Sequence, residues 1–350
     1  MIEVGIAGAS GYAGGELFRL LLQHPEVEIK IITSKQHSGE YIFKAHPNLK
    51  GLTNLTFVDM SPMEIASKVD VMFLALPHGS SNKIMPEILD LGTRVIDLSA
   101  DFRLHNSEDY PLWYGWEHSS PDLLDKFVYG LPELHRDEIR NSKNVAVPGC
   151  IASSAIYSLA PLAKSGLIHD HVVVDGKIGS SGSGNKSSIS TNYSERYNSV
   201  RVYSPVGHRH TGEIEQELYL ASGTQVKVAM SAHAVNMVRG ILTTSSVFTD
   251  LLVEETHLWK AYRSMYGSEQ FIRFMMNSDG IFRYPDPKLV IGSNFADLGF
   301  AVDRHAHRIV GIGAIDNLIK GTAGNAIQCM NIMMGFRETE SLMSAPMRLI

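Results

Sequence analysis

The chain has 350 residues, 44% of them hydrophobic and 19% charged, and it carries a formal net charge of −6. This composition is typical of a globular protein with room for about two domains, and it excludes fibrous, disordered and strongly basic nucleic-acid-binding proteins. No apolar run reaches the roughly 18 residues of a membrane span and no signal-peptide pattern precedes the first expected strand, so we expect a cytoplasmic protein that does not enter membranes. Two cysteines, Cys150 and Cys329, are too few for a disulfide framework or a metal cluster, so we expect no metal.

Short apolar runs alternate with helical patterns in the first part of the chain. The expected strands cover residues 4–7, 27–32, 71–76, 95–98 and 145–147. Alternation of this kind predicts an α/β fold with a doubly wound parallel sheet of the Rossmann type. We therefore expect a nucleotide-binding domain over residues 1–149.

Glycine recurs at every third position where the first expected strand gives way to a helix, at Gly8, Gly11 and Gly14. Glycine lets the backbone approach a pyrophosphate closely, and the free N–H groups and dipole of a helix N-terminus favour the anion. A tight turn with close packing is the alternative. The position between a strand and an amphipathic helix favours dinucleotide binding.

The second expected strand runs out into Thr33-Ser34-Lys35-Gln36. An NAD site usually places Asp or Glu there to bond the ribose 2′-hydroxyl, and this segment has neither. Ser34 and Lys35 suit a 2′-phosphate, so we expect NADP(H). For Lys35, a solvated loop position is the alternative.

Two further strand ends point to the same edge of the sheet, where open α/β folds bind ligands. After residues 71–76, Ser80 and Ser81 are placed to cap the next helix. After residues 95–98, Arg103 could neutralise a substrate phosphate. A structural salt bridge from Arg103 to a neighbouring aspartate is the alternative.

The fifth expected strand is followed by Pro148-Gly149-Cys150 and then by a helical run of small and apolar residues. A helix N-terminus stabilises a thiolate, which is the nucleophilic form of cysteine. A buried structural cysteine is the alternative, and we assign that role to Cys329. A cysteine nucleophile beside a nicotinamide indicates acyl chemistry, in which the thiolate forms a thioester that a hydride then reduces.

Such chemistry needs a proton donor and acceptor, and we predict them at His208-Arg209-His210, directly before an expected helix. His208 is the predicted acid/base, and Arg209 or His210 is predicted to position the substrate. Any single one of the 15 histidines is more often structural. Two histidines that bracket an arginine are unusual enough to favour the site.

Two other polar segments are candidates for ligand contact. The glycine-rich residues 180–187 include Ser183 and Lys186, whose backbone amides and ammonium could hold an oxyanion or phosphate, with a flexible linker as the alternative. Asn317 follows an expected strand over residues 309–315 and could bond a carboxamide. Simple helix capping explains Asn317 as well.

In combination, four motifs resemble the N-acetyl-γ-glutamyl-phosphate reductase family and its lysine-pathway relatives over nearly the full length of the chain. They are Gly8-x-x-Gly11-x-x-Gly14, Pro148-Gly149-Cys150, His208-Arg209-His210-x-x-Glu213-Ile214 and Asp316-Asn317-Leu318-Ile319-Lys320-Gly321. The resemblance implies NADPH-dependent reduction of a γ- or δ-acyl phosphate to a semialdehyde, by a Rossmann domain and an α+β domain that mediates catalysis and oligomerisation. It also implies residue roles: a pyrophosphate loop of Ser10, Gly11, Tyr12 and Ala13, a 2′-phosphate contact at Ser34, Lys35 and Gln36, the nucleophile Cys150, the acid/base His208, and a nicotinamide contact at Asn317.

The chain departs from the bacterial arginine-pathway members at two places. Those proteins typically follow the cysteine with Tyr-Pro-Thr and carry Ser-Gly-Ala-Gly-Arg, where this chain has Ile151-Ala152-Ser153 and Ser181-Gly182-Ser183-Gly184-Asn185. Together with residues 231–240, these differences make the chain more similar to archaeal-type members, which act on aminoadipate or glutamate carried on the small acidic protein LysW.

The resemblance therefore implies LysW as a partner, and five basic residues are candidates to meet its acidic tail: Lys177, Lys186, Arg201, Arg209 and Arg239. Ordinary surface charge is the alternative for them. N-acetylglutamyl phosphate and, less favoured, aspartyl phosphate are alternative substrates. A protein that senses NADP(H) without catalysis is the alternative from another class.

The motifs also predict the domain plan. We expect an NADP-binding domain over residues 1–149, a catalytic and oligomerisation domain over 150–315, and a C-terminal helix in 316–350 that returns to the first domain. Exposed apolar positions on the sheet of the second domain are expected to pair subunits in a homodimer or homotetramer.

Overall fold

The computed structural model describes residues 1–277 and 279–348. Two compact units are present: Met1–Pro148 with Thr322–Met343 form unit 1, and Gly149–Gly321 with the described residues after Met343 form unit 2. The expected segment 316–350 is therefore divided. Residues 316–321 belong to unit 2, and helix α10 (Gly324–Met334) belongs to unit 1.

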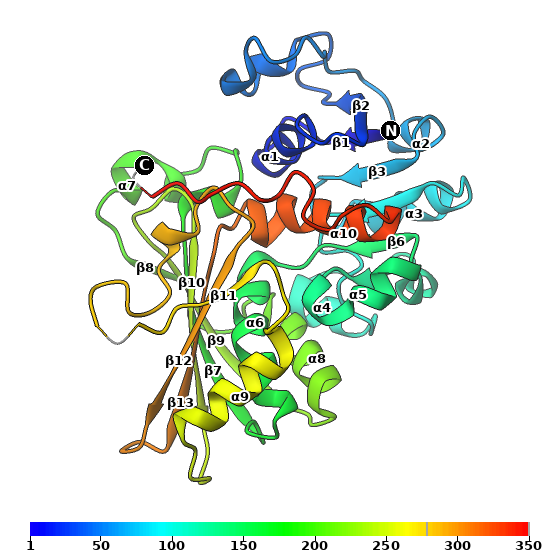
Figure 1. Cartoon of the computed structure of the whole chain (residues 1–350). Coiled ribbons are helices and arrows are strands. Elements are labelled where there is room, and N and C mark those ends of the chain that lie inside the picture. Colours follow the sequence, from blue (N-terminus) through cyan, green and yellow to red (C-terminus); the bar gives the residue numbers. More distant parts are fainter. Residues whose placement is uncertain (278, 349–350) are drawn as a thin grey trace. The chain divides into compact units, whose positions relative to one another are not determined.

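Unit 1 is built on a six-stranded parallel sheet in the order β2-β1-β3-β4-β6-β5, which confirms the α/β prediction (Figure 1). The strands are β1 (Ile2–Ala7), β2 (Val27–Thr33), β3 (Val71–Leu74), β4 (Arg94–Asp97), β5 (Val128–Tyr129) and β6 (Asn144–Ala146). β2 pairs with one edge of β1 and β3 pairs with the opposite edge, so the direction of the chain across the sheet reverses after β2. This reversal is the point at which open α/β sheets bind ligands, beyond the carboxyl ends of the strands.

The helices of unit 1 are α1 (Tyr12–Leu21), α2 (Pro62–Ala66), α3 (Ser81–Leu89), α4 (Asp109–Tyr114), α5 (Pro132–Asn141) and α10. All four residues of β3 are fully buried, as expected for a strand covered on both faces. Polar contacts also attach α10 to this unit: Asn331 Oδ1 lies 2.9 Å from His24 Nε2, and Gln328 Nε2 donates to Glu133 Oε1 at 3.1 Å.

The predicted serine cap of α3 is wrong. Neither Ser80 nor Ser81 caps the helix; the Ser81 hydroxyl instead donates to the buried Asp97. Asp101 takes the capping role, because its carboxylate accepts hydrogen bonds from the backbone N–H groups of Gly79 (2.7 Å) and Asn82 (2.9 Å). A charged acceptor suits the positive end of the helix dipole better than a hydroxyl.

Unit 2 contains a mixed seven-stranded sheet in the order β11-β12-β13-β10-β7-β9-β8. Its strands are β7 (His171–Ile178), β8 (Arg201–Ser204), β9 (Lys227–Ala234), β10 (Ile241–Phe248), β11 (Ile272–Phe274), β12 (Ala296–Asp303) and β13 (Arg308–Ile315). Exposed and buried residues alternate along β7, β9 and β10. One face of this sheet is therefore covered and the other is open in the single chain.

Helices α6 (Cys150–Lys164), α8 (Thr211–Ser222) and α9 (Glu255–Tyr266) lie on the covered face, as Figure 1 shows. The short helix α7 (Tyr193–Arg196) precedes the edge strand β8. A single π-helical turn (Ile319–Ala323) leads into α10. In the described parts of the chain, no helix has both the length and the hydropathy needed to cross a bilayer.

Candidate active site

The glycine turn after β1 is tightly built at two positions and open at the third. Gly8 has a φ of +83°, and a Cβ there would overlap the carbonyl oxygen of Ala75. A Cβ on Gly14 would lie 2.6 Å from the Gly8 oxygen, whereas a Cβ on Gly11 would have the same oxygen as its nearest neighbour at 3.8 Å. Gly11 is the N-cap of α1, so space is left where the helix N-terminus presents its N–H groups.

The neighbouring predicted coenzyme residues lie around this turn and at the end of β2. Tyr12 is exposed, and Ser10 and Ala13 are half-buried. Ser34 is buried directly after β2, and Lys35 and Gln36 are exposed. The carboxyl end of β2 therefore presents an ammonium group and an amide to solvent.

Cys150 is the first residue of α6 and is half-buried. The backbone N–H of the preceding residue, Gly149, donates to Oε2 of the fully buried Glu213 at 2.7 Å. A Cβ on Gly149 would lie 2.5 Å from His210 Nε2, so His210 packs directly against the turn that carries the cysteine. The structure thus brings Cys150, His210 and Glu213 together.

His208 is buried, and its two ring nitrogens have different partners. Nδ1 accepts the backbone N–H of His210 at 3.2 Å, and Nε2 lies 3.2 Å from the hydroxyl of Tyr203. Because Nδ1 is an acceptor, the neutral ring carries its proton on Nε2. Burial, assisted by the positive charge of Arg209, lowers the pKa of His208 to about 4, so the ring is neutral at physiological pH.

Tyr203 connects this histidine electrostatically to the cysteine. Tyr203 is 47% exposed, and its partial burial raises its pKa to about 12; the charge of Cys150 acts in the same direction, while Arg209 and Arg196 oppose it. Arg209 is exposed, and Arg196 donates to the carbonyl of Ile178 at 3.0 Å. The cysteine, the tyrosine and two cations therefore share one electrostatic environment that suits an anionic substrate.

Arg103 has the environment of a structural arginine. It is 5% exposed, and its guanidinium donates to the carbonyls of Val147 (2.7 Å) and Leu98 (3.2 Å). These bonds fix the turn after β4 against the end of β6. We therefore leave Arg103 out of the proposed substrate contacts.

The two remaining polar segments differ in exposure. Ser183 and Lys186 are exposed and accessible to a ligand. Asn317 is buried: its Oδ1 accepts the N–H of Gly240 at 2.8 Å and its Nδ2 donates to Ser181 Oγ at 3.0 Å. Asn317 thus joins two turns of unit 2, and contact with a nicotinamide stays a prediction.

Two residues of this site were not predicted as such. The sequence showed Glu213 only as a member of a motif and gave it no role. Its position three residues after His210 is the signal that could have identified it, because this spacing places both side chains on one side of the first turn of α8. Tyr203 carried no signal in the sequence. Among the described residues, no group of three or more His, Cys, Asp or Glu side chains could hold a metal ion.

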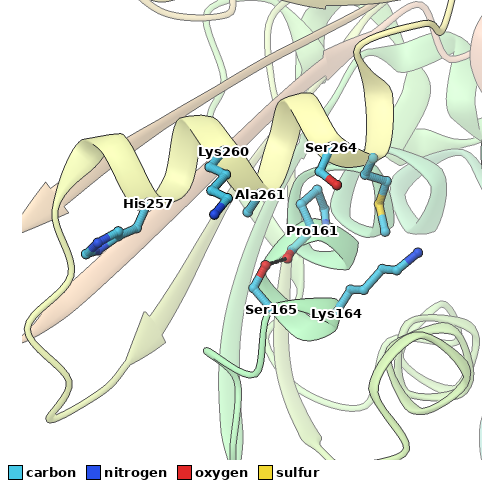
Figure 2. Close-up of a pocket in the computed structure, with 8 residues that line it drawn as sticks. Pro161, Lys164, Ser165, His257, Lys260, Ala261 and Ser264 are labelled. Carbon is cyan, nitrogen blue, oxygen red and sulfur yellow. Dashed lines mark hydrogen bonds between the residues drawn. The ribbon is translucent and has the colours of Figure 1, made fainter.

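A groove of about 400 Å³ lies between α6 and α9, lined by Pro161, Lys164, Ser165, His257, Lys260, Ala261, Ser264 and Met265. It is at the end of α6 opposite Cys150. Figure 2 shows Lys164 and His257 pointing in opposite directions, so these side chains do not converge on one point. The groove contains none of the predicted site residues and is not the candidate active site.

Unit 1 has a glycine turn after the first strand of a parallel sheet, and in unit 2 a helix that begins with a cysteine covers a mixed sheet. These features are those of an α/β oxidoreductase with a dinucleotide-binding domain. Residues 3–142 match the model of the semialdehyde dehydrogenase NAD-binding domain, and residues 150–317 match that of the semialdehyde dehydrogenase dimerisation domain. The chain belongs to the semialdehyde dehydrogenase family.

Similar proteins carry a more specific name. A protein of Picrophilus torridus is 57% identical over 98% of both chains, and one of Nitrosopumilus maritimus is 49% identical over 99% of both. Both are named "[LysW]-L-2-aminoadipate/[LysW]-L-glutamate phosphate reductase". Among solved structures, an aspartate semialdehyde dehydrogenase of Vibrio cholerae superposes with a TM-score of 0.71 at 17% identity, covering 96% of this chain and 98% of that one. This likeness shows the fold.

Proposed function

We propose that the chain reduces a LysW-linked aminoadipyl or glutamyl phosphate to the corresponding semialdehyde with NADPH, in lysine or arginine biosynthesis. The main support for this proposal is the sequence identity of 49–57%, over nearly the full length of the chain, to proteins with that name. The half-buried cysteine at the start of α6, beside His210 and in the electrostatic environment of Tyr203, supports the chemistry. The predicted location is the cytoplasm.

The residues at the carboxyl ends of β1 and β2 fit NADP(H). The open Gly11 at the start of α1 would receive the pyrophosphate, and Ser10, Tyr12 and Ala13 flank it. Ser34, Lys35 and Gln36 would meet the 2′-phosphate. When bound, NADPH supplies the hydride that brings the acyl carbon to the aldehyde level.

Cys150 supplies the covalent step. Its thiolate attacks the acyl carbon, the bond between that carbon and the phosphate oxygen breaks, and phosphate leaves with the electron pair. The acyl group is then held on Sγ as a thioester. After reduction, the C–S bond breaks, which returns the thiolate and releases the semialdehyde.

His208 supplies a hydrogen bond to the oxyanion that develops on the acyl carbonyl oxygen. Its Nε2–H faces the Tyr203 hydroxyl in the resting protein and would donate to the oxyanion once substrate is bound. A neutral ring is the form that can donate here without bringing a full positive charge into a buried position. Arg209, Ser183 and Lys186, all exposed, are the proposed phosphate or carboxylate contacts, and His210 positions Cys150.

An acidic carrier protein would bind to basic side chains that are exposed on the surface of this chain. Lys186 and Arg209 are exposed, and we retain them as contacts for LysW; Arg201 is exposed as well, but its guanidinium also lies 3.8 Å from the Glu195 carboxylate. Lys177 is 3.0 Å from Asp175, and Arg239 is 3.2 Å from the buried Asp316, so we assign these two to structure. The open face of the unit 2 sheet, with Val173 and Phe248 exposed, is the proposed homodimer surface.

The decisive experiment is phosphate-dependent NADP⁺ reduction, measured with wild-type protein and with Cys150→Ser. We expect turnover with LysW-linked aminoadipate or glutamate semialdehyde, a loss of roughly a thousandfold or more in Cys150→Ser, and unchanged NADPH binding. Turnover only with the N-acetylglutamate or the aspartate semialdehyde would assign the chain to that branch. NADPH binding without turnover on any of the three would favour a sensing protein.

The coenzyme choice has its own test. Lys35→Glu should weaken NADPH far more than NADH, because it places a carboxylate where the 2′-phosphate is expected. Lys50→Glu, another exposed lysine of unit 1, is the matched control and should change neither affinity. Equal affinity of wild-type protein for NADH and NADPH would reject the assignment.

A further inference from the structure

The helix that carries the nucleophile has small side chains along one side. Cys150, Ser154 and Ser158 follow one another at intervals of four residues in α6, so they lie on the same face of the helix. Ser154 and Ser158 are fully buried. This side of α6 can therefore approach another backbone closely.

Three glycines lie opposite these three residues. A Cβ on Gly311 would lie 3.0 Å from the Ser158 carbonyl oxygen, and one on Gly313 would lie 2.5 Å from the Ser154 oxygen. A Cβ on Gly321 would lie 2.8 Å from the Cys150 Cβ. We call Gly311, Gly313 and Gly321 the glycine track. The first two belong to β13, and Gly321 lies in the π-helical turn that follows.

Gly321 differs from the other two because it faces the nucleophile itself. Only at Gly321 is the nearest atom the Cβ that carries the reacting sulfur; at Gly311 and Gly313 it is a main-chain oxygen. A side chain at position 321 would therefore displace the thiol directly. At positions 311 and 313 it would press on the helix one or two turns further on.

The segment around Gly321 is held firmly, so it cannot move aside easily. The Gly321 N–H donates to the Asp316 carbonyl at 2.9 Å, and the Asp316 carboxylate accepts the N–H groups of Gly292, Leu318 and Ile319 at 2.8 to 3.2 Å. Lys320 is fully buried, with its ammonium 5.3 Å and 5.5 Å from the ring centres of Tyr157 and Phe271. Cys150 is the first residue of α6 and half-buried, so its side chain is the part that can move.

We propose that Gly321 is a positioning residue: the absence of a side chain at 321 sets the place of the Cys150 thiol at the start of α6. This inference rests on the proposed role of Cys150 as the nucleophile. The π-helical turn begins at Ile319, after β13 has ended at Ile315, and it holds the main chain of residue 321 against Cys150. π-helical turns inside α-helices are frequent at functional sites for this kind of local adjustment.

The test compares Gly321→Ala with Gly311→Ala in the full-length protein. Two assays are used. The reductase assay gives kcat and KM, and alkylation by iodoacetamide gives the reaction rate of Cys150 as a function of pH, with Cys150→Ser as the blank for Cys329. For Gly321→Ala we expect kcat to fall about tenfold or more, because a displacement near 1 Å is costly at a reacting centre. The KM for NADPH should stay unchanged, and the alkylation profile should shift.

Gly311→Ala is the matched control, because its added Cβ also presses on α6 but two turns beyond the nucleophile. It should keep the wild-type alkylation profile even if it lowers the melting temperature. Equal changes in both variants, or a wild-type profile in Gly321→Ala, would overturn the proposal.

Two further measurements distinguish a folding defect from a loss of the positioning role. If Gly321→Ala does not fold, Ile315→Val is added, because it removes the Cδ1 atom that would lie 3.3 Å from the new Cβ. Failure of this double variant to fold, while Gly311→Ala folds, would show that Gly321 serves folding and would reject the positioning role. Wild-type turnover in Cys150→Ser would instead reject the proposed function, and the alkylation profiles would still report where the thiol lies.

Discussion

The hydroxyl of Tyr203 lies 3.2 Å from Nε2 of His208 because Tyr203 is the extra residue of a β-bulge. In the pairing of β8 with β9, Val202 is opposite His233 and Ser204 is opposite Ala232, so Tyr203 has no partner. Such an insertion turns a side chain away from its regular direction in the strand. Here it turns the phenol toward the histidine, with the two rings edge to face at 5.9 Å.

Tyr203→Phe tests the value of that hydroxyl. The variant keeps the ring and removes one hydrogen bond to His208, which is worth about 0.5–1.5 kcal/mol, so kcat should fall by a factor of about 2 to 13 with an unchanged KM for NADPH. Tyr197→Phe is the control, because Tyr197 is about as exposed as Tyr203 but its ring stacks on Tyr193 at 5.2 Å. Equal kcat values for the two variants would contradict an orienting role for Tyr203.

The lowered pKa of His208 predicts a defined dependence of stability on pH. The ring has a pKa of about 4 in the folded chain and an ordinary value of 6.5 when unfolded, so the unfolded chain binds more protons between these values. The contribution of His208 to the free energy of unfolding is therefore complete above pH 6.5 and is lost as the pH falls toward 4. Urea unfolding at pH 7.5 and 5.0 should show a smaller acid loss for His208→Gln than for wild type, and identical losses would count against it.

Asp97 in unit 1 predicts a dependence of the opposite sign. Burial, followed by the charge of Asp101, raises the pKa of Asp97 from 3.8 to about 7. The folded chain then holds more protons than the unfolded chain between pH 4 and 7, so the Asp97 contribution weakens as the pH rises through this window. Asp97→Asn should remove that dependence, and urea unfolding at pH 4.5 and 7.5 measures it; a variant with the wild-type dependence would show that Asp97 does not titrate there.

The open position at Gly11 predicts a variant that folds but binds NADPH poorly. Gly11 has a φ of −78°, which any residue adopts, and an added Cβ meets only the Gly8 oxygen at 3.8 Å. Gly11→Ala should therefore keep its melting temperature and lose about tenfold or more in NADPH affinity, measured by fluorescence titration. Gly14→Ala should instead lower the melting temperature, because its Cβ would lie 2.6 Å from a main-chain oxygen. Wild-type NADPH affinity in Gly11→Ala would place the pyrophosphate elsewhere.

The predictable parts of the fold were those with a local signal. Strand β3 was visible because a parallel strand buried on both faces is a continuous apolar run. Strand β5 has two residues, too few for any periodicity, and it exists only because β6 is there to pair with it. The position of Cys150 followed from the strand, the Pro-Gly turn and the helix, all adjacent in sequence.

The unpredicted parts depend on residues far apart in the chain. The bulge at Tyr203 is defined by its pairing with β9, about thirty residues later, and no pattern around Tyr203 announces it. The cap of α3 by Asp101 needs the turns after β3 and β4 to meet. The alternation Gly311-Ile312-Gly313 did carry a signal, since glycine inside a strand often marks a close approach of another backbone.

The glycine track also sets a boundary for anyone who wishes to evolve this enzyme toward new acyl substrates. Libraries aimed at the exposed residues 183–190 can alter charge and shape without moving the helix that presents the sulfur. A methyl group added at Gly321 would move the reacting atom for every substrate alike, so this position is best kept constant in such libraries.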